Sequence, residues 1–209
     1  MQAELNEKLD GIGNRLRAER TKADVSQREL ARRLGLSPSL ISQIESGLSK
    51  PSVGTLYAIV TELGLSLDRI IRGADFDQSG ASLASPTVES VVRPEDRKAI
   101  DLDSGVRWEE LSAATDDGID FLEAIYEVGG ASTPDESLMR HHGREYGYIV
   151  SGTLSVQIGF HRYDLAPGDS IAFDSTEPHR LFNDGDVPVR AIWFVSGRDL
   201  DHRIDSTPG

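Results

Sequence analysis

The hydrophobic periodicity of this 209-residue chain changes once, and that change limits the folds that it can adopt. Up to residue 73, apolar side chains recur at the three- to four-residue spacing of amphipathic helices, as Ile12 and Leu16 do. From about residue 91, short alternating runs such as FLEAIYEV and TLSVQI are separated by Gly, Pro and Asp, which is typical of strands and turns. The sequence therefore predicts an all-α domain followed by an all-β domain.

Capping residues divide the helical part into short segments. Ser26, with Glu29 three positions later, predicts the start of one short helix, and Gly35 predicts its end. Ser37 predicts the start of the next helix, because a proline at the first helical position follows it. Two short helices therefore meet across a tight turn. We predict a five-helix bundle over residues 1–73 in total.

Residues 74–90 separate the two patterns. This segment is rich in Gly, Ser, Ala and Asp and has no apolar period, which predicts a flexible linker. Such a linker is too soft to transmit a rigid rotation from one domain to the other. We therefore expect a helical domain at 1–73, a linker at 74–90 and a β domain at 91–209. Many short strands at this spacing predict a sandwich or a small barrel.

The charge of the chain is unevenly distributed between these parts. Its net charge is −13, which argues against a nucleic-acid partner, because phosphate binding requires cationic groups. However, residues 1–75 hold 11 Lys and Arg against 10 Asp and Glu, whereas residues 76–209 hold 11 against 25. Within residues 11–33, seven basic side chains outnumber three acidic ones. A nucleic-acid partner is therefore compatible with the first domain and not with the second.

Two absences from the sequence restrict the chemistry further. The chain contains no cysteine, so any metal must be held by nitrogen and oxygen ligands. No apolar run approaches the roughly 18 residues of a membrane span, and the polar start MQAELNEKLD lacks the apolar core of a signal peptide. We expect a cytoplasmic protein with no membrane partner.

The stretch SQRELARRLGLSPSLISQIESG closely resembles the helix-turn-helix of the lambda-repressor-like, XRE-type transcription regulators, and the resemblance covers most of residues 10–73. In that family the second helix of the pair lies in the major groove and presents its N-terminal residues to base edges. The resemblance implies that the partner is a double-stranded DNA operator. One such helix covers little sequence, so we expect a homodimer on a site of two-fold symmetry.

The expected reading helix begins at Pro38, and its outward positions are candidates for base contact. Gln43 can make a bidentate contact with adenine, whereas serine hydroxyls discriminate weakly between bases. Other side chains, Arg15 among them, are better placed to contact phosphate, which fixes the register without reading sequence. The predicted DNA-binding set is Gln27, Arg28, Ser37, Ser39, Ser42, Gln43 and Lys50.

Two spaced motifs stand in the second domain, H-x3-E-x6-G at residues 141–152 and G-x10-H-x3-N at residues 168–183. Together they resemble the two signature motifs of the cupin family, which implies an all-β cupin barrel, the double-stranded β-helix, over residues of about 91–197. The sequence departs from the family where it matters, because Met139 replaces the usual first histidine. The adjacent His142 is a weak substitute, since neighbours on a strand face opposite ways.

The histidines and the glutamate that remain, His141, Glu145 and His179, have the composition of a two-histidine, one-carboxylate facial triad. The resemblance implies that these three side chains converge inside the barrel. Such a set suits a divalent ion without selecting it strongly, so iron, manganese, nickel and zinc are all candidates. The alternative is a metal-free pocket, in which these side chains hydrogen-bond a polar small molecule or one another.

A small-molecule effector is the second partner expected for the cupin domain. Aromatic side chains on the strands are candidate walls of its pocket, and Arg107 and Arg140 are among the cations that could pair with a carboxylate. An amino acid, an amine or a small organic acid fits the related regulators. The predicted ligand pocket consists of Arg107, Tyr126, Tyr148, Phe173, Asn183 and Trp193.

The order of the two domains resembles two kinds of protein. One is a family of bacterial transcription regulators in which the cupin senses a small metabolite, and the other is hydroxypropylphosphonate epoxidase, a mononuclear iron oxygenase with the same layout. An enzyme that uses the helices only as a scaffold has no need of a reading helix with Gln43 and basic residues around it. Both features are present, so we predict a DNA-binding regulator that is not an enzyme, with the epoxidase-type oxygenase as the alternative.

Overall fold

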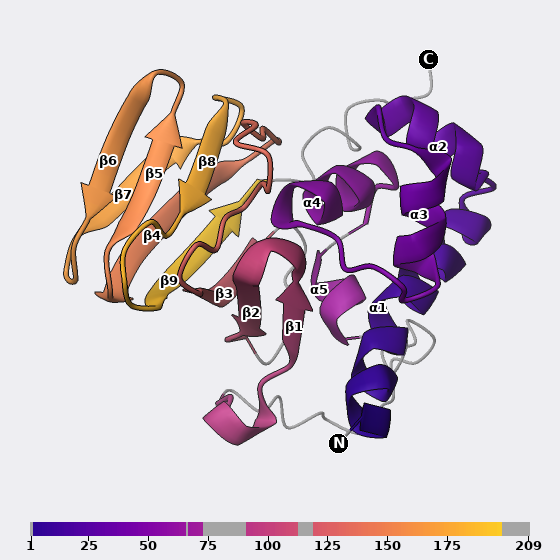
Figure 1. Cartoon of the computed structure of the whole chain (residues 1–209), viewed down its shortest axis with the longest axis horizontal. Coiled ribbons are helices and arrows are strands. Elements are labelled where there is room, and N and C mark those ends of the chain that lie inside the picture. The colour runs from indigo at the N-terminus through magenta and orange to yellow at the C-terminus, as the bar shows by residue number, and fades with distance from the viewer. Residues whose placement is uncertain (1, 66, 73–90, 113–118, 198–209) are drawn as a thin grey trace, which may run out of the picture.

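The computed structural model describes residues 2–65, 67–72, 91–112 and 119–197 (Figure 1). The predicted linker at 74–90 lies outside these described residues, so its flexibility stays a prediction. Helices form the first part and strands the second, as the change in periodicity predicted. None of the described helices is long and apolar enough to cross a membrane.

The helices are α1 (Gln2–Lys22), α2 (Gln27–Leu34), α3 (Pro38–Glu45), α4 (Val53–Glu62) and α5 (Leu67–Arg72). The predicted caps are confirmed, because the Ser26 hydroxyl accepts a hydrogen bond from the Glu29 N–H at 3.1 Å. In the same way the Ser37 hydroxyl accepts from the Leu40 N–H at 3.1 Å. Gly35 ends α2 with a φ of 66°, a left-handed conformation that glycine adopts without steric cost.

The expected bundle of five helices needs a correction. Within the described residues, four helices have eight residues or more, whereas α5 has only six. The core lies between α1, α2, α3 and α4, where Leu30, Ala31 and Leu56 are almost fully buried. Small Ala31 lets α2 approach its neighbours closely, so the predicted tight pairing of α2 and α3 is present.

The strands of the described region form two antiparallel sheets. The larger sheet has the order β1-β2-β3-β9-β4-β7, and the smaller has the order β6-β5-β8. The strands are β1 (Ala99–Leu102), β2 (Val106–Glu110), β3 (Ile119–Tyr126), β4 (Arg144–Ser151), β5 (Leu154–Ile158), β6 (His161–Leu165), β7 (Ser170–Asp174), β8 (His179–Phe182) and β9 (Val189–Ser196).

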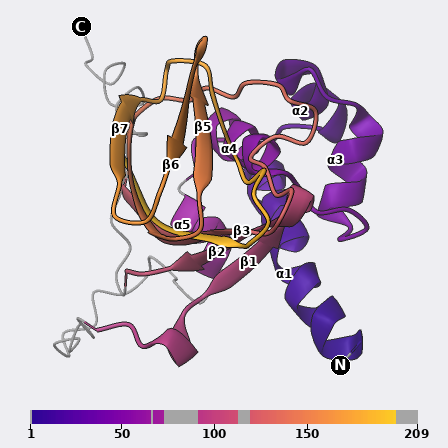
Figure 2. The same cartoon turned by 60° about the vertical axis from the view of Figure 1, so that its left-hand side comes forward.

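The two sheets face each other across an apolar interior (Figures 1 and 2), to which both contribute buried residues such as Ile149 and Val156. No ladder joins the sheets among the described strands, so the expected barrel is corrected to two facing sheets that hydrogen bonds do not close. Residues 127–143 run from β3 to β4, and isolated bridges attach Ala131 and Met139 of this segment to β8. The crossing segment thereby positions the first residues of the site.

The helix α4 connects the two parts of the molecule (Figure 1). The Gly54 N–H in its first turn donates to the Ser132 carbonyl at 3.0 Å. Just before α4, the carbonyl of Pro51 accepts from the Asp103 N–H at 2.9 Å. A Cβ at Gly54 would lie 3.0 Å from the Thr133 methyl carbon, which is tighter than an ordinary contact. The N-terminal end of α4 is therefore docked closely on the crossing segment.

Candidate functional site

The side chains of His141, Glu145 and His179 meet inside the β domain, as the motif spacing predicted. His141 lies in the loop before β4, Glu145 is on β4 and His179 begins β8. One potential ligand atom from each residue lies within 4.8 Å of the other two. All three residues are buried, with His179 at 0% exposure. Burying ionisable groups away from water is costly unless a shared proton or a bound cation compensates their charge.

Hydrogen bonds outside the cluster fix how the three side chains are turned. The His141 Nδ1 lies 3.0 Å from the carbonyl of His142, and the His179 Nδ1 lies 2.8 Å from the carbonyl of Glu177. Since a carbonyl only accepts, each Nδ1 carries the hydrogen and each Nε2 is left with a lone pair. The Trp193 indole N–H donates to the Glu145 Oε2 at 2.7 Å. Such outer partners typically orient metal ligands.

The three inward atoms are arranged as ligands of an ion rather than as hydrogen-bonding partners. The His141 Nε2 and the His179 Nε2 each lie 3.0 Å from the Glu145 Oε1. These three buried atoms nevertheless have no hydrogen bond of acceptable geometry. Lone pairs that face one another at this separation repel unless a proton or a metal cation lies among them. The residues present therefore fit a divalent ion bound by two imidazoles and one carboxylate.

The electrostatics of the cluster agree with a negatively charged carboxylate. Burial raises the pKa of Glu145, but the two adjacent imidazoles, as proton donors and positive charges, lower it by more, so the net pKa lies well below the usual range. Burial lowers the pKa of His179, whereas the Glu145 carboxylate raises it by more. The anionic oxygen is thus maintained in the interior by neighbours that can also ligate a cation.

The position of the missing first histidine of the cupin motif is occupied by Met139. Its backbone forms two hydrogen bonds with that of His179, at 2.9 and 2.8 Å, so this segment is held as a strand would be. The adjacent His142 is exposed, as the alternation argument expected, and does not replace the missing ligand. The ligand set therefore contains three protein side chains.

The space around the cluster is small, and part of its wall comes from the helical domain. The interior chamber has a volume of about 20 Å³ and is lined by Val53 and Tyr57 of α4 as well as by strand residues. The Tyr57 ring stacks on the His141 ring with centroids 4.5 Å apart. It also meets Trp108 edge-on at 5.4 Å. Sequence reasoning missed Tyr57, because it reads as one more apolar position on a helix.

The predicted pocket residues divide into two groups. Tyr126 and Trp193 line the interior chamber, and the Phe173 ring lies 5.0 Å from the His179 ring. Burial raises the pKa of Tyr126, and the Glu145 carboxylate raises it further, so this phenol stays protonated. Whether any of the three contacts a ligand stays a prediction.

The other three predicted pocket residues do not line the interior chamber. Arg107 forms ion pairs on the sheet surface with Asp101 at 2.9 Å and Glu109 at 3.1 Å. Tyr148 is 49% exposed, because it stands on the outer face of β4. The buried Asn183 amide donates to three backbone carbonyls and accepts from the Gly185 N–H, so it stabilises a turn.

The helical domain presents a continuous exposed face on α3. Ser39, Ser42 and Gln43 are exposed, whereas Ile41 and Ile44 on the other face are buried. The remaining predicted DNA-binding residues differ in their environment: Arg28 is exposed, Lys50 is half-buried, and Ser37 is exposed with its hydroxyl engaged as the α3 cap.

Two side chains that the sequence suggested for contact with DNA also form hydrogen bonds within the protein. The Gln27 amide donates to the Glu45 Oε2 at 2.7 Å, beside a bidentate pair of Glu45 with Arg20. Arg15 donates to the carbonyls of Ile70 and Ile71 at 2.5 and 2.8 Å, which connects α1 to α5. Both side chains therefore have a structural role, and their contacts with DNA stay predictions.

Known proteins share both parts of this architecture. A helix-turn-helix family model matches residues 16–70, and a cupin domain family model matches residues 122–195. The chain is 28% identical over 172 residues to the HTH-type transcriptional regulator PuuR of Escherichia coli. This match covers 82% of this chain and 86% of that protein. It is also 43% identical over 60 residues to the uncharacterized HTH-type transcriptional regulator y4dL of Sinorhizobium fredii. This match covers 29% of this chain and 31% of that protein.

A solved structure gives the same arrangement. An HTH_3-family transcriptional regulator from Vibrio cholerae is similar with a TM-score of 0.64 and 20% identity, over 90% of this chain and 96% of that chain. At this level of identity the likeness supports the fold. The helices thus form a helix-turn-helix domain, and the facing sheets form a cupin domain.

Proposed function

We propose that this helix-turn-helix transcriptional regulator with a cupin domain binds a two-fold symmetric operator as a homodimer, under the control of ligands of the cupin domain. The exposed face of α3 is the observation that carries the proposal. Ser39, Ser42 and Gln43 project from a helix that Ile41 and Ile44 fix against the core. A helix held in this way can place its side chains against base edges in the major groove.

The operator can be found by selecting random duplexes on the full-length protein. Fluorescence anisotropy then compares the selected site with a random duplex of equal length at one salt concentration, because such affinities depend steeply on salt. We expect half-sites about one helical turn, roughly 34 Å, apart and binding at least ~10³-fold tighter than to random duplex. Equal affinity for both duplexes would contradict a sequence-specific role, and one chain per duplex would contradict the dimer.

For the cupin domain we propose one divalent ion, iron, manganese, nickel or zinc, held by His141, Glu145 and His179. The support is the convergence of two imidazole nitrogens and one carboxylate oxygen that do not hydrogen-bond one another. When bound, such an ion supplies Lewis acidity and open positions for a ligand oxygen or nitrogen. The protein residues hold the ion, orient its ligands and exclude water.

Elemental analysis tests the metal proposal. Protein purified without chelators or a nickel column is expected to carry close to one ion per chain, and Glu145→Ala is expected to carry almost none, since it removes the anionic ligand. Glu127→Gln, at an exposed position outside the cluster, is the control and should keep the ion. Well under one ion per chain in the unaltered protein would instead favour the metal-free pocket.

The size of the chamber argues against the oxygenase alternative. A volume of about 20 Å³ admits an ion or a water molecule but no organic substrate, and Tyr57 covers His141. Iron-loaded protein is therefore expected to consume no more oxygen with a phosphonate substrate than without it. Oxygen uptake that depends on the substrate would support the enzyme.

A further inference from the structure

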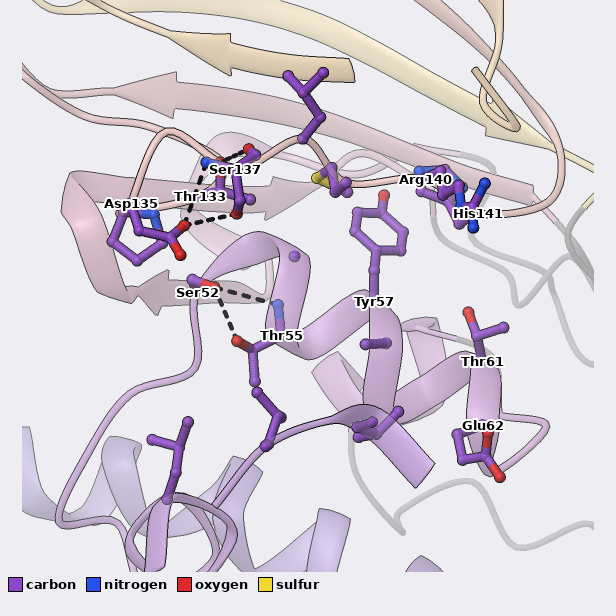
Figure 3. A pocket seen from close by; sticks show the side chains of 18 residues that line it. Ser52, Thr55, Tyr57, Thr61, Glu62, Thr133, Asp135, Ser137, Arg140 and His141 are labelled. Carbon is purple, nitrogen blue, oxygen red and sulfur yellow. Dashed lines mark hydrogen bonds between the residues drawn. The ribbon is translucent and has the colours of Figure 1, made fainter. Parts of the chain in front are cut away.

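A second and much larger cavity lies between the two domains. It has a volume of about 560 Å³ and is lined on one side by the α2–α3 turn and α4, and on the other by residues 133–141 of the crossing segment. Figure 3 shows Tyr57 pointing from α4 toward the segment that carries Arg140 and His141. Ligand pockets of proteins are typically about 300–1,000 Å³. This cavity is therefore of the size that a metabolite needs, and the interior chamber is not.

We propose that the effector of this regulator binds in the interdomain cavity and is a small organic anion with an apolar body. The inference rests on the proposed regulatory function and names the ligand class and the site. It differs from the expectation that the effector enters the cupin interior.

The apolar body is inferred from the walls of the cavity. Leu34, Leu36 and Leu40 contribute from the α2–α3 region, Ala58 from α4, and Leu138 from the crossing segment. Leu138 is 36% exposed, so a ligand that covers it removes apolar surface from water. Both domains provide part of this surface, and an apolar ligand would hold them together.

The negative charge of the ligand is inferred from Arg140, the guanidinium among the lining residues of the cavity. Glu62 is paired with Arg33 at 3.0 Å. The Asp135 carboxylate accepts from the Ser137 hydroxyl at 2.6 Å, which lowers its pKa and keeps it anionic, and it lies on the side of the cavity away from Arg140 (Figure 3). Arg140 has neither an ion pair nor a hydrogen bond among the described residues. A carboxylate, phosphate or sulfonate is the natural partner of such a guanidinium.

The cavity touches both functional elements of the molecule. Leu40 belongs to the first turn of α3, the helix that carries Gln43, and Leu36 lies in the turn before it. Tyr57 and Met139 line both the cavity and the interior chamber, so they form the partition between the effector and the metal ligands. A ligand in the cavity would therefore contact the DNA-binding helix and the metal centre at once.

Binding of anilinonaphthalene sulfonate to the full-length protein without DNA tests the proposal, because this probe combines an anion with an apolar body and fluoresces in apolar sites. We expect one saturable site per chain, from which hexanoate displaces the probe while hexylammonium at the same concentration does not. Arg140→Gln should raise the Kd about tenfold, as expected when one charge-assisted contact is lost. Arg93→Gln, at an exposed arginine outside the cavity, is the matched control and should leave the Kd unchanged.

A second variant fills the cavity without changing its charge. Ala58→Trp should abolish probe binding while circular dichroism shows the normal helix content. Equal displacement by hexylammonium and hexanoate would overturn the assigned charge. Unchanged probe binding in both Arg140→Gln and Ala58→Trp would overturn the assigned site. Because these titrations contain no DNA, either result is distinguishable from failure of the regulator to recognise an operator, which the selection experiment measures.

Discussion

The Glu145 carboxylate accepts one hydrogen bond from outside the His141–Glu145–His179 cluster, from the Trp193 indole N–H at 2.7 Å. If this bond fixes the orientation of the carboxylate, Trp193→Phe should weaken metal affinity by about 10–100-fold, as loss of an outer-shell partner usually does. Competition with a chelating dye measures the change. Trp108→Phe is the matched control, because Trp108 also lines the chamber and has no bond to Glu145. An equal loss in both variants would mean that packing, and not the bond, is responsible.

The Arg20–Glu45 pair is the other buried charge interaction with a clear consequence. Two guanidinium nitrogens lie 2.5 and 2.8 Å from the carboxylate oxygens, and Gln27 adds a donor at 2.7 Å. Since removing one member leaves the other charge buried, Glu45→Gln should lower the free energy of unfolding by about 3 kcal/mol at pH 7. Urea unfolding followed by circular dichroism measures this loss.

The same carboxylate predicts how that loss depends on pH. Burial raises the pKa of Glu45, but Arg20 and Gln27 lower it by more, so its net pKa lies below the unfolded value. The stabilisation is therefore present above about pH 4.3, the unfolded pKa, and disappears as pH falls through the folded pKa. Glu127→Gln, at an exposed carboxylate, is the control and should not change stability measurably. A difference between wild type and Glu45→Gln that stays constant down to pH 2 would contradict this assignment.

The residues of the site differ in how well the sequence could predict them. His141, Glu145 and His179 were found because motif spacing preserves which strand positions face inward, whatever the surrounding residues are. Arg107 and Tyr148 lie on the surface of the sheet and not at the interior chamber, because residue type alone does not determine the phase of alternation on a strand. Tyr57 gave no signal, since its contact with His141 joins two domains and leaves no local pattern.

At the scale of elements, α3 is determined by local signals, and its DNA-reading role gives a direct test. Gln43→Ala should cost about 1–3 kcal/mol at one base position of each half-site, because it removes a bidentate contact. Anisotropy titrations against the selected operator and its single-base variants measure this. Arg28→Gln is the comparison, and it should weaken binding evenly across sequences and reduce the salt slope by about one. If Gln43→Ala weakened specific and random DNA equally, Gln43 would not read a base.

The helix α4 shows where prediction of elements from sequence reaches its limit. Its existence follows from the apolar face of residues 53–62, and the Ser52 hydroxyl caps it by accepting from the Thr55 N–H at 3.2 Å. Its second function, closing the cupin interior, depends on Gly54 and Tyr57 meeting residues more than 75 positions away. Periodicity and capping describe neighbours along the chain, so they carry no information about such a contact.

At the scale of the whole molecule, the docking of α4 changes how the two domains can communicate. The linker expected at 74–90 is too soft to transmit a rigid rotation from one domain to the other. The hydrogen bond from Gly54 to Ser132 and the stacking of Tyr57 on His141 provide a direct route instead. An ion that repositioned His141 would move an imidazole ring that stacks on Tyr57 of the helix-turn-helix domain.

This route predicts reciprocal coupling between metal and operator. If the ion changes operator affinity through Tyr57, operator must change metal affinity by the same factor, expected at about 5–150-fold. Titrating metal into protein with and without saturating operator measures that factor. In Tyr57→Ala it should fall close to one, because the stacked contact with His141 is lost. Tyr163→Ala, at a half-exposed tyrosine on β6, is the control and should retain the wild-type factor. A wild-type protein whose metal affinity is the same in both titrations has no such coupling, and effector control would then have to act through the interdomain cavity alone.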